Sequence, residues 1–174
     1  MDRPASEAPA SWQHYILAFV LALGAWMLLA GTLSGQELIL GALVALVVTA
    51  LSGSHLGVLT GIRFTLAAPL HVVLFLGAFL KALVLANLDL ARRVLTPSLP
   101  IRPDLVEIET GLESALGRLL LTSAITLTPG TLSVDVKGQR ILVHWVYCPP
   151  GLDMQARTRA IAGAFERHLK GFVT

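Results

Sequence analysis

Hydrophobic side chains fill the first half of the chain in three long runs, and alternating apolar and polar positions appear only in the second half. The first run, Trp12 to Ala30, has no charged residue. At ~1.5 Å per residue it is long enough to cross the hydrocarbon core of a bilayer. Residues 31–35 predict a turn, and a second run is apolar from Leu38 to Leu51. That stretch is short for a span, so a re-entrant piece and a full span ending near Leu59 are both open.

The third run extends from Phe64 to about Leu90 and becomes amphipathic after Leu80. Lys81 and Asp89 enter the sequence there, while leucines and valines continue at helical spacing. This pattern predicts a long helix that leaves the bilayer and continues along or beyond its surface. Pro97 predicts its end, since proline disfavours helical geometry in the residue before it.

The positions of Lys and Arg leave two membrane topologies open. Lys and Arg near the ends of spans favour the cytoplasmic side, so Arg92, Arg93 and Arg102 place the C-terminal part in the cytoplasm. Three full spans would put Arg3 and Arg63 outside the cell. Two spans with a re-entrant or surface-lying third segment would put every arginine inside.

The second half of the chain reads as a small α+β domain. Its predicted elements are a strand over Leu105–Thr110, a helix over Leu112–Leu127, strands over Thr131–Lys137 and Arg140–Val146, and a helix from Asp153 to about Gly171. Gly138 and Gln139 join the last two strands into a hairpin. The order β-α-β-β-α predicts a two-layer domain with helices on one face of a short sheet. We therefore expect a membrane-embedded helical region over residues 1–98, with two to three helices, and a cytoplasmic domain over residues 99–174.

Composition supports this division and removes several classes of function. The chain is 55% hydrophobic and 14% charged, whereas soluble domains are roughly 45–50% apolar and about 25% charged. A net charge of +2 does not suggest nucleic-acid binding. The single cysteine, Cys148, has no partner for a disulfide or a paired metal site. Nucleotide-binding and hydrolase motifs are absent from the sequence, and no histidine pair has metal-ligand spacing. We expect no catalytic residue, metal or cofactor.

Three charged residues of the hydrophobic half are candidates for function, because charges within membrane segments are functional hypotheses by default. Lys81 and Asp89 could serve transport, or could reach the interface and pair with a neighbouring subunit. Glu37 could carry protons, or could simply favour the start of its helix through the helix dipole. A pump needs a continuous series of ionisable groups across the bilayer. These few charges do not supply one, which argues for a supporting role.

Three stretches of the chain carry a resemblance to a known family. They are Asn87–Leu95 followed by Pro97 and Pro100, the run Leu127–Val136, and Ile141–Trp145. Over nearly its whole length the chain resembles the E subunit (MnhE or MrpE) of the multisubunit Mrp-type Na⁺/H⁺ antiporter. The resemblance implies partners among the other subunits of such a complex, within the lipid bilayer of the bacterial inner membrane, and no catalytic residue.

The most specific part of the resemblance is a turn motif, made of Thr128, Pro129, Gly130, Thr131 and Ser133. We interpret these residues as shaping a turn, with contact to an ion or ligand as the alternative. The predicted function is an accessory, non-catalytic subunit of a sodium/proton antiporter complex that acts in assembly and stability. The alternatives are an equivalent subunit of a hydrogenase- or respiratory-type complex, and a stand-alone membrane adaptor.

Overall fold

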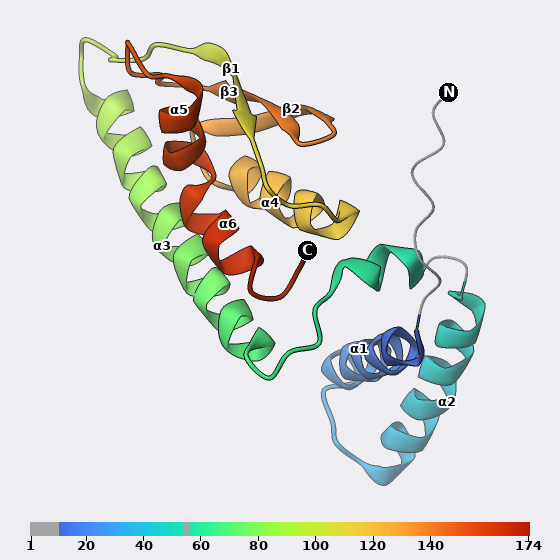
Figure 1. Cartoon of the computed structure of the whole chain (residues 1–174). Coiled ribbons are helices and arrows are strands. Elements are labelled where there is room, and N and C mark those ends of the chain that lie inside the picture. Colours follow the sequence, from blue (N-terminus) through green and yellow to red (C-terminus); the bar gives the residue numbers. More distant parts are fainter. Residues whose placement is uncertain (1–10, 54–55) are drawn as a thin grey trace. The chain divides into compact units, whose positions relative to one another are not determined.

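The first two hydrophobic runs form a pair of packed helices in the computed structural model, which describes residues 11–53 and 56–174. Helix α1 covers Trp12–Ala30, as predicted, and α2 covers Gly35–Leu51 (Figure 1). α2 begins before the apolar run because the Ser34 hydroxyl accepts a hydrogen bond from the Glu37 amide and caps the helix. α2 ends at Leu51 and does not continue to Leu59. Leu59 belongs instead to a separate 3₁₀ helix, η1, which covers Leu56–Gly61. Arg3, which entered the topology argument, lies outside the described residues.

Small residues allow α1 and α2 to pack closely. Gly41, Ala45 and Thr49 are the buried residues of α2 and recur every four positions, so they form one stripe along the helix. A Cβ atom on Gly41 would lie 2.5 Å from Cδ1 of Trp26. The indole of α1 therefore occupies the space that the glycine leaves open.

The remaining helices and strands form a second compact unit, residues 61–174. Its elements are α3 (Ala68–Leu95), β1 (Asp104–Glu109), α4 (Ala115–Leu127), β2 (Thr131–Lys137), β3 (Arg140–Trp145), α5 (Met154–Ile161) and α6 (Gly163–Leu169). The strands form one antiparallel sheet in the order β1-β3-β2. α4 packs on β2, α5 on β1, and α6 on α3 and α4. The structure thus contains the two predicted parts, an apolar helical region followed by a small α+β domain.

Helix α3 contributes to the packing of this domain. Phe75 and Phe79 of α3 pack on the buried ring of Phe165 in α6, with ring centroids 6.4 and 6.5 Å apart. Phe75 also meets Phe172 at 6.0 Å. The compact units consequently divide at residues 60 and 61. The division into membrane-embedded and cytoplasmic parts at residues 98 and 99 stays a prediction.

The prediction of one long final helix is wrong, because the helix breaks at Ala162, which is fully buried. Gly163 follows, and glycine lowers the cost of interrupting a helix. The break lets α5 pack on β1 while α6 turns toward α3 and α4. In β2 the pairing with β3 shifts register between Ser133 and Asp135. The apolar residues Leu132, Val134 and Val136 of this strand are all exposed.

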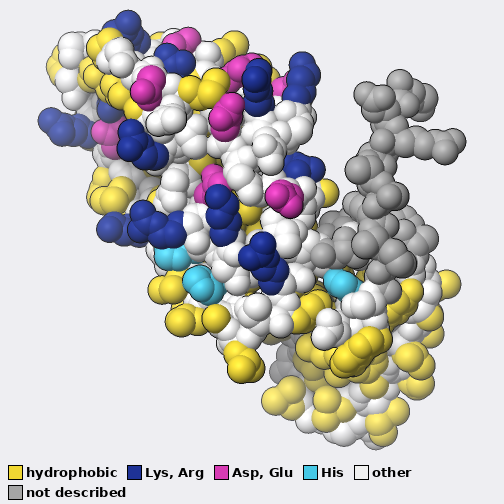
Figure 2. Space-filling model, in the orientation of Figure 1, with side chains coloured by type: hydrophobic (Ala, Val, Ile, Leu, Met, Phe, Trp, Pro, Cys, Tyr) yellow, Lys and Arg dark blue, Asp and Glu magenta, His cyan; other side chains and the backbone are white. Residues whose placement is uncertain are grey.

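Among the described residues, α1 and α3 are long and apolar enough to cross a membrane, judged by length and composition alone. α2 is shorter, and its ~26 Å length lies at the lower limit for a span. Figure 2 shows hydrophobic side chains over much of the surface of α1 and α2, and Lys, Arg, Asp and Glu gathered over the C-terminal domain.

Candidate functional site

The C-terminal half of α3 and the loop after α4 enclose a groove of about 440 Å³, here called the α3 groove. Its lining residues are Ala82, Ala86, Asp89, Leu90, Arg93, Thr128, Pro129, Gly130, Thr131, Trp145, Val146, Tyr147, Pro149, Ala160, Ile161, Ala164 and Phe165. The groove brings Asp89 together with the first four residues of the turn motif, although they lie far apart in the sequence.

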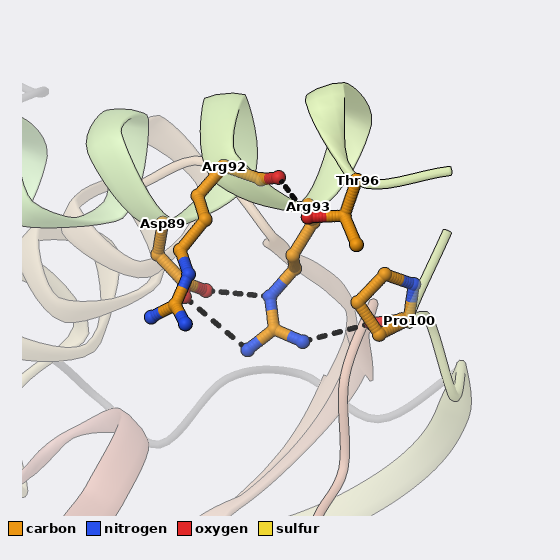
Figure 3. Close-up of polar contacts among 5 residues, drawn as sticks. All are labelled: Asp89, Arg92, Arg93, Thr96 and Pro100. Atoms are coloured by element: carbon orange, nitrogen blue, oxygen red, sulfur yellow. Dashed lines mark hydrogen bonds and ion pairs between the residues drawn. The ribbon is translucent and has the colours of Figure 1, made fainter. Parts of the chain in front are cut away.

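Arg93 connects the end of α3 to the rest of the domain (Figure 3). Its Nε donates to Oδ2 of Asp89 at 2.7 Å and its Nη2 to Oδ1 at 3.3 Å, which makes a bidentate ion pair. Nη1 donates to the Pro100 carbonyl oxygen at 2.8 Å. The guanidinium also lies 4.0 Å from the centroid of the Tyr147 ring, a cation–π contact. The side chain of Asp89 is 56% exposed and that of Arg93 is 18% exposed, so the ion pair is open to solvent mainly at its carboxylate.

The turn motif satisfies the backbone at the end of α4. The Thr128 hydroxyl donates to the Ala124 carbonyl at 2.8 Å, and the Thr131 hydroxyl donates to the Ile125 carbonyl at 2.7 Å. These carbonyls belong to the last turn of α4, where the intrahelical hydrogen bonds end, and both also accept from the Thr128 amide at 3.2 Å. Gly130 has a φ of +95°, a conformation that side chains with a Cβ rarely adopt. Its carbonyl accepts from the Val146 amide at 2.9 Å, which joins the turn to the end of β3.

Ser133 lies outside the α3 groove, in a separate depression between α4 and β2. Its hydroxyl donates to the Thr122 carbonyl at 3.2 Å. The neighbouring Asp135 lies 3.2 Å from the Lys137 ammonium. The hydrogen bond from Lys137 and a second one from the Val136 amide lower the pKa of Asp135.

The two other charged candidates lie apart from the groove. Glu37 belongs to the first unit, where its Oε2 accepts from the Trp26 indole at 3.1 Å. It also stands in the first turn of α2, where the helix dipole favours a negative charge. Lys81 is exposed on α3, and no ion pair to it occurs among the described residues. The described part of the chain contains no group of three His, Cys, Asp or Glu residues able to hold a metal ion.

Sequence reasoning missed Arg93 as the residue that organises the groove. The sequence marks Arg93 only as one of the arginines that place the C-terminal part in the cytoplasm, although it stands within the run Asn87–Leu95 that carries the family resemblance. Spacing gave a partial signal, because Asp89 and Arg93 are four residues apart in a predicted helix and can pair. Tyr147 and the Pro100 carbonyl could not be found that way, since they come from other segments.

Comparisons with known proteins agree with this architecture. The family model MNHE, described as "Na+/H+ ion antiporter subunit", matches residues 19–171. The chain belongs to this family. It is 36% identical over 98 residues to the E subunit of the Na(+)/H(+) antiporter of Alkalihalophilus pseudofirmus, a match that covers 55% of this chain and 60% of that protein. It is 31% identical over 119 residues to the E1 subunit of the Na(+)/H(+) antiporter of Staphylococcus saprophyticus, covering 68% of this chain and 72% of that protein.

A solved structure extends the likeness to most of the fold. A chain in the membrane-bound sulfane sulfur reductase, an archaeal respiratory membrane complex, matches with a TM-score of 0.79 and 32% identity. The match covers 90% of this chain and 97% of that one. The family and the apolar helices together identify this chain as a membrane protein.

Proposed function

We propose that this chain is an accessory subunit of a multisubunit Na⁺/H⁺ antiporter complex, without a catalytic step of its own. The observation that carries the proposal is the family match over residues 19–171, which includes the apolar helices and the C-terminal domain. The side chains support an assembly role. Of the three charged candidates, Asp89 is neutralised within the chain by Arg93, and Glu37 is held by Trp26.

The turn motif acts in this proposal as part of the framework. Thr128, Thr131 and Ser133 direct their hydroxyls to carbonyls of their own domain. These bonds support a role in shaping the turn over contact with a transported ion. The C-terminal domain faces the cytoplasm, since Arg92, Arg93 and Arg102 lie on that side of the hydrophobic half.

A second candidate is the equivalent subunit of a respiratory-type membrane complex. The specific observation in its favour is the fold-wide match to a chain of the sulfane sulfur reductase at 32% identity. Both candidates give the chain the same kind of role, and they differ in the subunits around it. Where a redox complex carries iron–sulfur clusters, they are held by cysteines of its subunits.

The test is a pull-down of the tagged full chain from its native membrane in mild detergent, with mass spectrometry of the proteins recovered. Large antiporter subunits without redox partners would support the first candidate. Iron–sulfur subunits would transfer the chain to the second. Recovery of the chain alone, or with one soluble protein, would refute both and favour a stand-alone adaptor.

A further inference from the structure

Helix α3 satisfies the simple criteria for a membrane span, yet its neighbours do not suit the interior of a bilayer. Its 28 residues extend over ~42 Å at about 1.5 Å per residue, more than the ~30 Å of a hydrocarbon core. A helix that crosses this core needs lipid or uncharged protein around it, because charged side chains there are costly. The placement of α3 therefore depends on what packs beside it.

The C-terminal domain accompanies α3 along most of its length (Figure 1). Near the start of α3, the His71 ring occupies the space that a Cβ on Gly171 would need. The start of α3 and the residues that follow α6 are therefore in close contact. Near the other end, Arg93 lies on the Tyr147 ring. From His71 to Arg93 the helix rises ~33 Å, about the thickness of the hydrocarbon core. A spanning α3 would take the domain into the bilayer with it.

The part of the domain beside the most apolar half of α3 is charged. α6 packs on Phe75 and Phe79 through Phe165, and the residues that follow include Glu166, Arg167 and Lys170. Lys170 pairs with Glu166 at 2.8 Å, and its side chain is 53% exposed. These groups need water or headgroups around them. A stretch of α3 that passes beside them does not cross a hydrocarbon core.

The exposed acidic and basic residues of α3 gather on one side of the helix, its charged flank, while most of its exposed apolar residues lie on the remaining surface, its apolar flank. At 100° per residue, Lys81, Asp89 and Arg92 fall within one 80° sector. Leu74 and Leu85 are also exposed within that sector. The exposed apolar residues outside it are more numerous: Leu70, Val72, Val73, Leu76, Leu80, Val84, Leu88, Val94 and Leu95. The one polar residue among them, Asn87, donates its amide to the Leu83 carbonyl at 2.8 Å. This division is the pattern of a helix that lies in the membrane interface.

We infer that α3 lies in the plane of the cytoplasmic membrane surface, with its apolar flank among the lipids, and does not cross the bilayer. Lipid is the occupant because only 16 residues, 52–67, separate α3 from the apolar helix α2 along the chain, so α3 stays within reach of the bilayer that α2 would enter. Charge complementarity agrees, since Arg63, Lys81 and Arg92 suit anionic headgroups. With α1 and α2 as the two spans, every arginine of the chain lies on the cytoplasmic side. The inference does not depend on which complex the chain joins.

The experiment locates the two ends of α3 in the full chain, expressed in its native membrane. Cys148 is buried, and a Cys148→Ala background leaves the introduced cysteines as the only thiols of the chain. Thr65→Cys precedes α3 and Ser98→Cys follows it, and both positions are exposed. A membrane-impermeant maleimide is added to intact cells and to inverted vesicles. We expect both thiols to react only in inverted vesicles. Reaction from opposite sides of the membrane would overturn the inference.

A second measurement tests the lipid contact. A nitroxide label is attached at Val84→Cys, on the apolar flank. Oxygen dissolved in the lipid should increase the spin relaxation rate of this label, and a water-soluble nickel chelate should leave that rate unchanged. The matched label at Lys81→Cys, on the charged flank, should respond to the chelate. Shielding of Val84→Cys from both agents would show that another protein covers this flank, which refutes lipid as the occupant. If Cys148→Ala impairs folding, the introduced cysteines are labelled in the chain that keeps Cys148. The thiol of Cys148 is buried and is therefore shielded from the reagents.

Discussion

Replacing Gly130 by valine should destabilise the C-terminal domain by straining the backbone of the turn motif. Gly130 has a φ of +95°, where a β-branched residue is an outlier. No atom lies within 4 Å of a Cβ built there, so the Cβ itself meets open space and the expected cost comes from the backbone conformation. Left-handed backbone costs ~1–2 kcal/mol in a residue with a Cβ. That loss raises the unfolded fraction roughly 5–30-fold.

The assay is the midpoint of thermal unfolding of the purified full-length protein in mild detergent. Gly138→Val is the matched control, because Gly138 also has a positive φ, +60°, and open space around its Cβ. It lies in the hairpin turn away from the α3 groove. Both variants should unfold at a lower temperature than the natural protein. An unchanged midpoint for Gly130→Val would refute the argument that this turn requires glycine.

Gly130→Val also separates a framework role of the turn motif from a role in transport. In the native membrane, Gly130→Val should lower the amount of assembled complex, and transport should fall in proportion. Normal assembly with lost transport would contradict the framework role and place the turn in the ion path.

Five further substitutions, one of them a control, test other parts of the account. Phe165→Ala should cost ~3–5 kcal/mol, because it removes a buried ring between α6 and α3, and hydrogen exchange of the α3 amides should rise. Slow exchange in that variant would contradict the packing. Gly41→Leu should disrupt the α1–α2 pair by displacing the indole 2.5 Å from its Cβ, whereas Gly24→Leu, in open space, should leave the yield of folded protein unchanged. Equal yields would refute this. Lys81→Ala and Asp89→Ala should each change unfolding by less than ~1 kcal/mol and leave antiport in inverted vesicles intact; lost antiport with normal assembly would reject the supporting role.

The sequence predicted most elements because local signals define them. The charge-free run from Trp12 to Ala30 gave α1 its full extent, and the turn residues Gly138 and Gln139 placed the β2–β3 hairpin. The helix break at Ala162 was missed because Gly163 is also tolerated within helices. The break accompanies the packing of α5 on β1 and of α6 on α3 and α4, contacts that local sequence signals do not specify.

Hydrophobicity alone could not show which residues of α3 face lipid and which pack on the C-terminal domain. Phe75 and Phe79 have the same sequence signature whether they face lipid or the Phe165 ring, because both environments are apolar. The groove was equally hidden, since Asp89 and Gly130 meet only after α3 packs on the domain. The charged candidates were identified by residue type, but their partners Arg93 and Trp26 were not predicted.

The most direct test of the accessory role is removal of this chain from its native cell. Two quantities are then measured in the same membranes: the assembled complex on a native gel, and Na⁺-dependent proton antiport in inverted vesicles. The account predicts that both fall together and that the full-length chain restores both. A complex that assembles in full while antiport is lost would contradict the account, as would membranes in which neither quantity changes.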